Sequence, residues 1–551
     1  MINLDAYFHK YPFLMNVFSR CLLACWGLVS LVGCQEPTQE SNTRSRGFIY
    51  CGQSTPTTFN PQLTDSGLTA DTLAAQLFDR LLQLDPVSHQ PLPGLARSWD
   101  ISGDGLVYTF HLRSGIEFQT TPWFKPTRPF NAQDVVFSFK RVIEPNHPFY
   151  QASGGRYPWF ESIGFSHLIK DITMTDTNTV TFTLNRPDNA FLSNLATTYA
   201  VIYSQEYGQQ LLKAGQLDQL DMKPIGTGPF YLDSYVPNNV IRLKRHWGYW
   251  RGAAPMEQVI FDIASHGTGD LAKLLSQECD VLSSPVASQL PVISDDPEFE
   301  LLAQTGMNVA FLAFNNDKKS LANPKVRQAI NAAINRDNLL NSVYYGTGTE
   351  AKSLLPPMSW AYNHTSQAQG YNPELARTLL KEVGIEPGMT LDLLVPLDPR
   401  PYNPSPKKTA ELIQADLAAI GITLNVTIEK QDRISAISNQ FDMVLTGWIA
   451  DNGDPDNFLR PLLSCDAKQA GLNVANWCNL SFDNLLELAS RTNQLEQRVS
   501  YYHHAQDIID QEVPIVPLAH GVHFQVHHRS LGGLQMSPFG TRSFSSVYRS
   551  E

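Results

Sequence analysis

Charge of either sign is sparse in this chain of 551 residues. Charged residues make up 17% of the sequence, which is below the ~25% of an average globular domain. The formal net charge is −12, so the chain has no excess of basic residues with which to hold nucleic acid. The composition therefore argues against a nucleic-acid-binding protein.

Several short motifs of familiar enzymes are missing as well. The sequence contains no Gly-x-Ser-x-Gly and no His-Glu-x-x-His, which argues against common esterase and metalloprotease chemistry. Gly226-Thr227-Gly228 is not followed by Gly-Lys-Ser/Thr, so it is not a phosphate-binding loop. We expect a protein that is not an enzyme and that has no cofactor.

Long apolar runs are scarce, and the one near the N-terminus is short. Residues 21–33 form a run of 13 residues, which matches the core of a signal peptide but is below the ~20 residues that cross a bilayer. Leu31-Val32-Gly33-Cys34 resembles a lipobox. We predict a signal peptide over 1–34 with lipidation of Cys34, and soluble export as the alternative. Residues 35–46 are polar, as in a linker.

Cysteines are few, and export changes what they imply. Beyond Cys34, four cysteines remain, and an even number in an oxidising compartment predicts two disulfides. Cys465 and Cys478 are local partners, which leaves Cys51 to pair with Cys279. No Cys-x-x-Cys occurs, which argues against redox chemistry and against a zinc cluster.

The length of the chain predicts two lobes, because a single core stops growing near ~250–300 residues. Alternating patterns predict strands in the first half, and strand–helix–strand order in the second half predicts a parallel sheet covered by helices. The expected elements are strands at 107–112, 180–184, 389–396, 423–428 and 441–448, and helices that begin at Asn323-Pro324 and cover 405–420.

Two polar residues follow predicted strands of the second half. Arg400 comes after the strand 389–396, and Asp451 comes after the strand 441–448. Ligands of open α/β sheets bind outside the carboxyl ends of strands, so the pair predicts a site for the two ends of a zwitterion. The acidic loop around Asp451 has two other interpretations, a solvated turn and a calcium site. The EF-hand pattern fails, because Gly453 falls at its third position.

Collinear segments resemble the family 5 extracellular solute-binding proteins, which include dipeptide- and oligopeptide-binding proteins. The resemblance covers almost the whole mature chain. Its segments are LARSWDISGDGLVYTFHLRSGIEF (95–118), FNAQDVVFSFKR (130–141), IGTGPF (225–230), GMNVAFLAFN (306–315), NPKVRQAINAAINR (323–336), RPYNPSPKKTAELIQADLAAIGI (400–422) and GWIADNGDPDNF (447–458). HGTGDLAKLLSQECDV (266–281), NPSP (403–406) and SPFGTRSFSSVYR (537–549) are similar to the Sap branch of that family. That branch is linked to peptide uptake and to resistance against antimicrobial peptides.

The resemblance implies roles for residues of both halves. In the second half, Asp451 would hold the α-ammonium of a peptide and Arg400 its α-carboxylate, with Tyr402 beside the arginine and Trp448 in the wall of the pocket. Such contacts are charge-assisted and short.

In the first half, Ser66 and Gly67 match a loop that contacts the peptide. Asp65 departs from the pattern, because a small hydroxyl residue is expected there, and a second carboxylate would alter end-group recognition.

Histidines near the C-terminus invite a metal or haem hypothesis. His523, Gln525 and His527 alternate with apolar residues, so we interpret them as the solvent-exposed face of a strand near a hinge. Haem or metal binding occurs among relatives of the fold that the resemblance implies, and remains an alternative.

The sequence as a whole predicts a two-lobed α/β periplasmic-binding-protein fold of class II, with mixed sheets covered by helices. Lobe I would comprise 47–305 and 525–551, and lobe II 306–524, with a hinge at the crossings. We expect an exported, monomeric, periplasmic substrate-binding component of an ABC peptide importer, whose partners are peptides and inner-membrane permease subunits. The competing hypotheses are a haem- or metal-chelate-binding protein, an exported hydrolase, and a chaperone-like protein that binds unfolded chains.

Overall fold

A computed structural model describes residues 46–550, apart from 53–54, 65–66, 265–267 and 367–368. The chain divides into a unit up to Arg46 and a unit from Gly47 to Glu551, and the second unit is described here. The predicted signal peptide, Cys34, the linker up to residue 45, Asp65 and Ser66 lie outside the described residues. Within the described range, none of the helices combines the length and the apolar character that a membrane span requires.

The first half of the unit is built around a seven-stranded sheet in the order β12-β19-β11-β1-β10-β9-β8. β1 pairs in parallel with β10 and β11, and the other pairs are antiparallel. Its strands are β1 Gly47–Cys51, β8 Phe230–Val236, β9 Val240–Arg245, β10 Gln258–Asp262, β11 Val281–Leu282, β12 Phe299–Thr305 and β19 Val522–His528.

A four-stranded antiparallel sheet, β4-β5-β7-β6, also belongs to the first half. The strands predicted at 107–112 and 180–184 are confirmed as β5 and β7, and both show the expected alternation of buried and half-buried residues. The strands are β4 Ala96–Ile101, β5 Val107–Leu112, β6 Ile169–Asp176 and β7 Thr179–Leu184, with two-stranded pairs β2 Leu82–Leu84 with β3 Pro91–Pro93, and β20 Leu531–Gly532 with β21 Tyr548–Arg549.

Helices pack around these two sheets over one aromatic-rich core. The longest, α4, begins at a capping box in which Asn131 and Asp134 satisfy each other's main-chain N–H groups. The helices are α3 Ala74–Leu77, α4 Ala132–Ile143, α5 Pro148–Ala152, α6 Pro158–Ser162, α7 Phe165–Leu168, α8 Phe191–Leu195, α9 Gln205–Ala214, α10 Gln219–Met222, α11 Thr268–Leu275 and α12 Leu290–Ser294, with short helical turns η1 Pro61–Leu63, η2 Thr69–Leu73 and η3 Ala287–Gln289.

The second half contains a six-stranded sheet in the order β14-β18-β13-β17-β15-β16. Its strands are β13 Asn308–Phe314, β14 Thr349–Glu350, β15 Met389–Pro396, β16 Ile422–Glu429, β17 Met443–Ile449 and β18 Ile515–His520. The predicted parallel sheet is correct for β15, β16 and β17. β13 pairs antiparallel with β17 and β18, and β14 antiparallel with β18, so the sheet as a whole is mixed, as the predicted fold has it.

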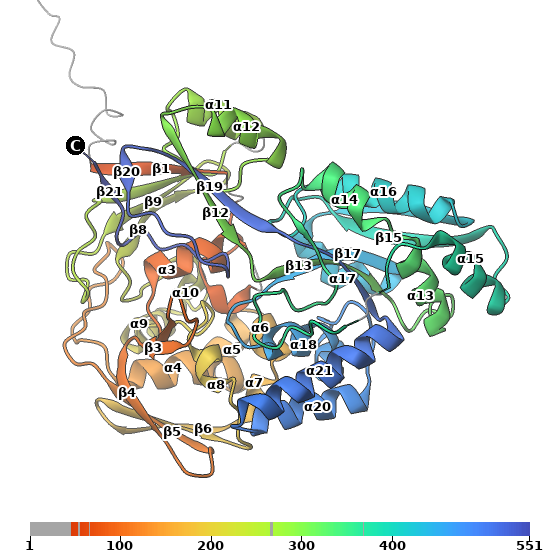
Figure 1. Ribbon diagram of the computed structural model, residues 1–551. Coiled ribbons are helices and arrows are strands. Elements are labelled where there is room, and N and C mark those ends of the chain that lie inside the picture. Colours follow the sequence, from red (N-terminus) through yellow and green to blue (C-terminus); the bar gives the residue numbers. More distant parts are fainter. Residues whose placement is uncertain (1–45, 53–54, 65–66, 265–267, 367–368, 551) are drawn as a thin grey trace, which may run out of the picture. The chain divides into compact units, whose positions relative to one another are not determined.

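Helices cover both faces of this sheet, so its central strand β13 is buried throughout. Ala310, Leu312 and Phe314 join the core beneath α13, α15 and α16, whereas the residues between them join the core beneath α18, α20 and α21. α20 and α21 lie side by side (Figure 1). The helices are α13 Pro324–Ala333, α14 Arg336–Val343, α15 Pro373–Glu382, α16 Pro406–Ala418, α17 Gln431–Ile437, α18 Asp456–Leu463, α19 Cys465–Ala470, α20 Leu480–Arg491 and α21 Leu495–Glu512, with the turn η4 Ser438–Gln440.

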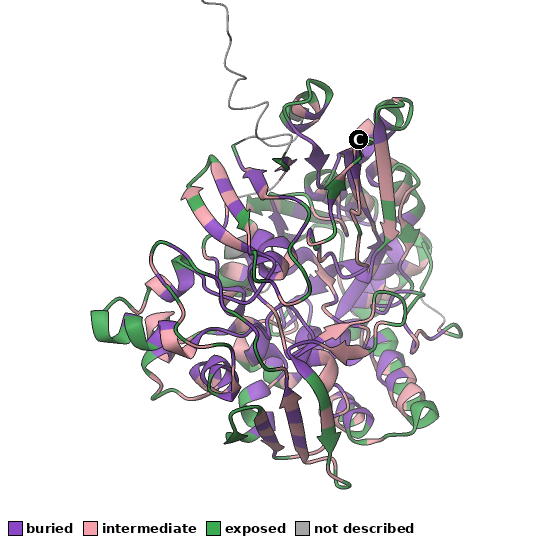
Figure 2. Cartoon of the chain, turned by 90° about the vertical axis from the view of Figure 1, so that its left-hand side faces the viewer, coloured by how far each residue is buried: buried purple, intermediate pink, exposed green. Residues whose placement is uncertain are grey.

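The helix predicted at Asn323-Pro324 is confirmed in its starting residue. The Asn323 side chain accepts a hydrogen bond from the Lys325 main-chain N–H, and Pro324 is the first helical residue, as expected for a cap followed by a proline. Val326, Ile330, Ala333 and Ile334 are all buried. Figure 2 shows buried residues on the strands and on one side of the helices, with exposed residues on the outward sides.

The chain passes between the two large sheets at two adjacent places, from β12 to β13 and from β18 to β19. Asn308 joins them: its Oδ1 accepts from the Gly521 main-chain N–H at 2.8 Å and its Nδ2 donates to the Gly521 carbonyl at 3.1 Å. The Gly306 N–H donates to the same carbonyl at 3.2 Å. A Cβ atom on Gly306 would lie 1.9 Å from Nδ2 of Asn308, so only glycine fits there without a rearrangement.

β19 corrects the interpretation of the C-terminal histidines. His523, Gln525 and His527 are at most 4% exposed, so they do not form the solvent-exposed face of the strand. The apolar residue Val526 packs with Leu274 and Ile293 of α11 and α12 on the opposite face. The sequence shows alternation, but alternation alone does not say which face is covered.

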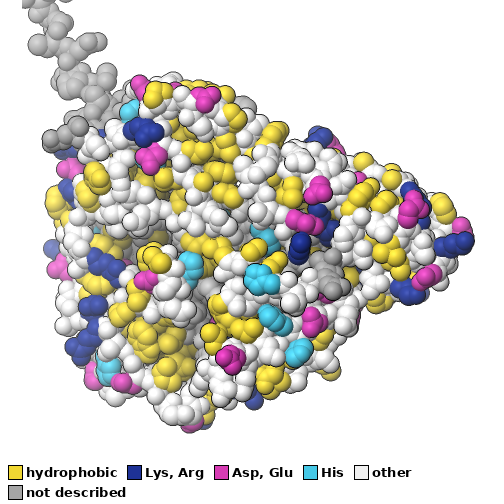
Figure 3. Space-filling view, in the orientation of Figure 1, with side chains coloured by type: hydrophobic (Ala, Val, Ile, Leu, Met, Phe, Trp, Pro, Cys, Tyr) yellow, Lys and Arg dark blue, Asp and Glu magenta, His cyan; other side chains and the backbone are white. Residues whose placement is uncertain are grey.

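Charged side chains on the face shown in Figure 3 are mixed in sign, with Lys and Arg interspersed among Asp and Glu. This distribution agrees with the low charged fraction of the sequence. The visible face carries no broad surface of one sign, and so no field of the kind that steers a highly charged partner.

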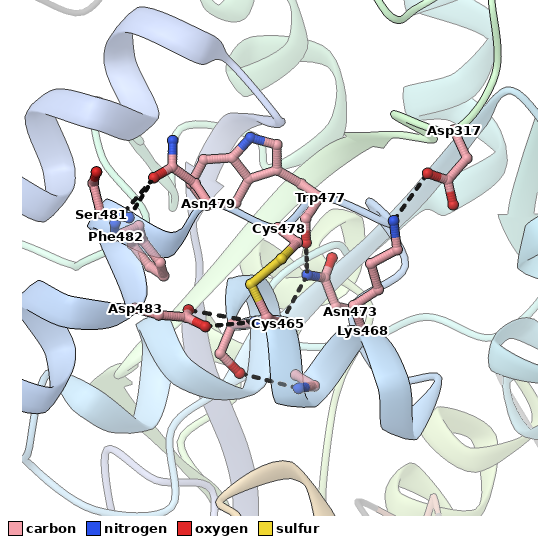
Figure 4. Close-up of a disulfide and its surroundings, with 12 residues drawn as sticks. Asp317, Cys465, Lys468, Asn473, Trp477, Cys478, Asn479, Ser481, Phe482 and Asp483 are labelled. Atoms are coloured by element: carbon pink, nitrogen blue, oxygen red, sulfur yellow. Dashed lines mark hydrogen bonds and ion pairs between the residues drawn. A yellow bond between two sulfur atoms is a disulfide. The ribbon is translucent and has the colours of Figure 1, made fainter.

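Both expected disulfides are formed, Cys51 with Cys279 and Cys465 with Cys478. Figure 4 shows the second bridge, which closes a short loop that contains α19. The Cys465 main-chain N–H donates to the Asp483 carboxylate, and Asn473 Nδ2 donates to the Trp477 carbonyl at 2.8 Å. The bridge therefore lies in a loop that hydrogen bonds also fix.

Candidate ligand-binding site

A cavity of about 310 Å³ is lined by segments of both halves of the chain. This volume lies within the ~300–1,000 Å³ of small-molecule sites. The walls come from the turn before η2, the segment 284–289, the turn after β15, the end of β17, the start of β19 and the C-terminal segment around Arg542. The residues predicted for ligand binding are placed against this cavity below.

Arg400 lines the cavity, as the sequence predicts for a residue beyond the end of β15. The turn that presents it is closed by two main-chain hydrogen bonds with Asn403, of 3.0 and 2.9 Å. The guanidinium is half-buried, and no described carboxylate forms an ion pair with it. A planar cation with five donors is thereby held at the cavity wall.

Tyr402 lies behind Arg400 and does not line the cavity. Its ring fills the space above Gly447, where a Cβ atom would be 2.3 Å from the ring. Its main-chain carbonyl accepts a hydrogen bond from the Tyr344 hydroxyl. The structure therefore gives Tyr402 the place of a support for the arginine-bearing turn.

Asp451 follows β17, two residues after the cavity-lining Ile449. Its carboxylate accepts a hydrogen bond from the Trp159 indole N–H at 2.8 Å and another from Asn457 Nδ2 at 3.3 Å. Burial raises the pKa of Asp451 to about 7, although both hydrogen bonds act to lower it. Asp451 itself is not a lining residue of the cavity, and its donor Trp159 comes from the first half of the chain.

Trp448 and Gly67 are placed differently from each other. The Trp448 indole N–H is buried without a hydrogen-bond partner, and the residue does not line the cavity. Gly67 does line it, with a φ of +94° and no atom within 4 Å of the position that a Cβ would take. Ser66, the neighbour predicted to act with Gly67, lies outside the described residues.

Asp71 of η2 and Arg542 of the C-terminal segment line the cavity and were not named in the sequence analysis. His523 of β19 also lines it, although its alternation was interpreted as a solvent-exposed face. Burial, followed by the nearby Arg542, lowers the pKa of His523 to about 3. The imidazole is therefore neutral at pH 7. Asp71 and Arg542 have no local signal in the sequence, because each reaches the cavity from a different part of the chain.

His527 and His528 lie within 4.0 Å of Glu300 and Glu298, but such pairs do not amount to a metal site. No group of three or more His, Cys, Asp or Glu able to hold a metal ion occurs among the described residues. Burial lowers the pKa of His520 to about 4, and its Nδ1 lies 2.7 Å from the Asn308 carbonyl oxygen. That histidine is part of the crossing between the sheets.

Comparison with known proteins shows which family this chain is similar to. The family model described as bacterial extracellular solute-binding proteins, family 5 Middle, matches residues 90–470. The chain is 46% identical to the peptide transport periplasmic protein SapA of Salmonella typhimurium, over 93% of this chain and 94% of that protein. It is 41% identical to heme-binding protein A of Haemophilus influenzae, over 93% of each chain. A dipeptide-binding protein of Pseudoalteromonas sp. SM9913, solved in complex with Met-Leu, has a TM-score of 0.89 and 39% identity over 92% of this chain and 100% of that one.

Proposed function

The chain belongs to the bacterial extracellular solute-binding proteins of family 5, and from this premise we propose that it captures peptides for an ABC importer. Its fold is the two-lobed α/β periplasmic-binding-protein fold, with a mixed sheet in each half. The peptide is held between the lobes and delivered to inner-membrane permease subunits.

One observation carries the proposal: Arg400 and Asp451 follow neighbouring parallel strands. β15 and β17 pair in parallel at Leu393 and Met443, so their carboxyl ends lie at the same edge of the sheet. A cation and a carboxylate at that edge match the α-carboxylate and the α-ammonium of a peptide with free termini. Main-chain groups between the ends bind without regard to side chains.

Asp451 is suited to an ammonium by its surroundings. A pKa near 7 means that the surroundings of Asp451 stabilise its ionised form poorly. A bound ammonium would stabilise the ionised carboxylate. Its hydrogen-bond partners Trp159 and Asn457 are neutral donors. Removing the carboxylate would leave a dehydrated ligand ammonium unpaired, at a cost of about 3–5 kcal/mol.

We assign 47–305 and 525–551 to lobe I and 306–524 to lobe II, with the hinge at the crossings that Asn308 joins. Contacts between the halves support this division as a closed state. Trp159 bonds Asp451, Asn194 Oδ1 accepts from Asn452 at 3.1 Å, and Arg186 pairs with Glu487 at 2.9 Å. Opening about the crossings would break these contacts and admit the ligand.

The remaining parts of the proposal concern the cell. The protein is exported to the periplasm and anchored by a lipid on Cys34, with soluble export as the alternative. It acts as a monomer without catalysis, and peptide capture contributes to antimicrobial-peptide resistance.

Calorimetric titration tests the end-group clamp. The ligand-stripped protein is titrated with a dipeptide, a tripeptide and an octapeptide, each with free, N-acetylated and C-amidated ends. Short peptides with free ends should bind the wild type tightly, and N-acetylation should weaken that binding. In Asp451→Asn, the free and the N-acetylated peptides should bind with the same affinity. C-amidation should likewise weaken binding to the wild type, and in Arg400→Gln the free and the C-amidated peptides should bind with the same affinity.

Asp466→Asn, which alters an exposed carboxylate on α19, is the matched control and should bind like the wild type. Equal affinity for free and blocked peptides would exclude the clamp.

Haem is the second candidate ligand, because the buried imidazole of His523 lines the cavity and a relative is named for haem binding. Titration with haem, followed in the Soret region, distinguishes the two. A Soret shift that saturates at one haem per chain and is lost in His523→Ala would favour haem over peptide.

A further inference from the structure

Arg542 is a buried cation at the cavity that the end-group clamp does not use. It is 7% exposed and lines the cavity. Its Nη1 donates to the Gly540 carbonyl at 3.3 Å, and its Nε has no acceptor. No described carboxylate forms an ion pair with this guanidinium. A guanidinium has five N–H donors, and a buried charge with so few partners is costly unless a ligand completes it.

The neighbourhood of Arg542 is polar on the face of the seven-stranded sheet that looks into the lobe. β11 pairs with β19 so that Leu282 is opposite Val526, and continuing this register places Ser283 opposite Gln525. Gln525 is fully buried, and neither atom of its amide has a partner. Tyr50 lies close to both Ser283 and Arg542, since burial raises the pKa of its hydroxyl while these two neighbours lower it. The Tyr50 hydroxyl, which has no hydrogen-bond partner, therefore lies near the cation, whereas Ser283 Oγ donates to the Gly52 carbonyl at 3.1 Å.

We propose that Arg542 forms a second subsite of the cavity, which binds a side-chain carboxylate of the bound peptide. The inference rests on the proposed function, in which Arg400 takes the α-carboxylate and Asp451 the α-ammonium. With both ends of the peptide accounted for, the buried arginine is left for a third charge. Arginine is suited to this task, because its planar fork binds a carboxylate in a bidentate manner.

Acidic residues at the same cavity do not reverse this preference. Asp71 and Asp270 each take part in an interaction already, and Asp398 is exposed at the wall. His523 adds no charge at pH 7, because its pKa lies near 3. Among the described residues of the cavity wall, the buried charge that lacks an ion-pair partner is the cation Arg542. The ligand group that complements it is therefore an anion.

The test compares Ala-Glu with its near-isosteric neutral partner Ala-Gln, and with Ala-Lys, by calorimetry on the ligand-stripped exported protein. Ala-Glu should bind at least about tenfold more tightly than Ala-Gln, as expected for a charge-assisted hydrogen bond in a buried site. In Arg542→Gln the ratio of the two affinities should fall to about one. Arg529→Gln, an exposed arginine of the same C-terminal region, should keep the wild-type ratio.

Arg542→Lys provides a second variant should the glutamine variant not fold. It keeps the charge but loses the fork, and its ratio should lie between those of the wild type and Arg542→Gln. Equal binding of Ala-Glu and Ala-Gln by the wild type, tightest binding of Ala-Lys, or an unchanged ratio in Arg542→Gln would overturn the subsite. Absence of binding by every peptide is a different result, because it removes the proposed function itself.

Discussion

At the residue scale, the role proposed for Asp451 would couple ligand capture to pH. Burial raises its pKa to about 7, whereas an ammonium ligand favours the ionised carboxylate. Below pH 7 a proton must therefore leave before the ammonium binds, and the affinity should fall toward about tenfold per pH unit. Calorimetry with a dipeptide at pH 5.5 and pH 7.5 should show this loss. The same affinity at both pH values in the wild type would contradict the assignment, and Asp451→Asn should show no such dependence.

The same carboxylate should affect the stability of the ligand-free protein. The folded-state pKa is about 7 against an ordinary value of 3.8, so between these values the folded protein binds the proton more tightly than the unfolded chain does. The stability from this group is present below pH 3.8 and is lost as the pH rises to 7. Asp451→Asn should therefore gain about 1–2 kcal/mol relative to the wild type between pH 5 and pH 8.

Urea unfolding at both pH values measures this difference. Comparison with the variant isolates Asp451 from other titrating groups such as Asp188, whose pKa burial and the nearby Asp456 raise to about 6. A free-energy difference between variant and wild type that is independent of pH would show that Asp451 has no raised pKa.

The sequence predicted some of these residues and not others, for a physical reason. Arg400 and Asp451 follow strands that a local pattern reveals, and the rule for ligands at strand ends applies to both. Trp159, which bonds Asp451, is 292 residues away in the chain. Arg542 reaches the cavity from near the C-terminus. No local sequence pattern therefore connects Trp159 with Asp451, or Arg542 with the cavity.

At the scale of elements, the two crossings between the sheets depend on Asn308. Its side chain both accepts from and donates to the main chain of Gly521, and it is fully buried. Asn308→Ala should leave both Gly521 groups without these partners and reduce the free energy of unfolding by about 1–3 kcal/mol. Urea unfolding measures the loss.

Asn316→Ala is a comparison variant, since Asn316 also bonds main-chain carbonyls but lies away from the crossings, on the loop after β13. Equal stability of Asn308→Ala and the wild type would show that the crossings are held by other contacts.

The prediction of elements succeeded where the hydrophobic pattern had a clear period or clear ends. It did not reach strands whose direction is decided by distant pairing partners. β15 was predicted with its observed bounds, Met389–Pro396, because its apolar run is bounded by turn residues. β13 and β18 were not among the predicted strands, and their antiparallel direction depends on strands far away in the sequence. In β19 the alternation was present, but its polar residues are buried, as is the apolar Val526 on the opposite face.

At the scale of the whole molecule, the proposed hinge makes the contacts between the halves part of a closed state that the ligand should favour. Closure buries the ligand and re-forms contacts such as the pair of Arg186 with Glu487. Small-angle scattering of the ligand-stripped protein should show a larger radius of gyration than that of the protein saturated with a dipeptide. Identical radii in the two states would contradict a hinge that closes on the ligand.

The size of the chain and its family resemblance were enough to predict two lobes, because both are properties of the whole sequence. The ligand preference is a property of a few side chains that meet only in the folded protein. The length of the bound peptide depends on the space between the lobes, which no segment of the sequence encodes by itself.

The most direct test of the central claim is a crystal structure of the protein saturated with a dipeptide that has free termini. The account predicts the α-ammonium within hydrogen-bonding distance of the Asp451 carboxylate and the α-carboxylate on the Arg400 guanidinium, with both lobes in contact with the peptide. A peptide bound elsewhere, or one whose termini contact neither residue, would contradict it.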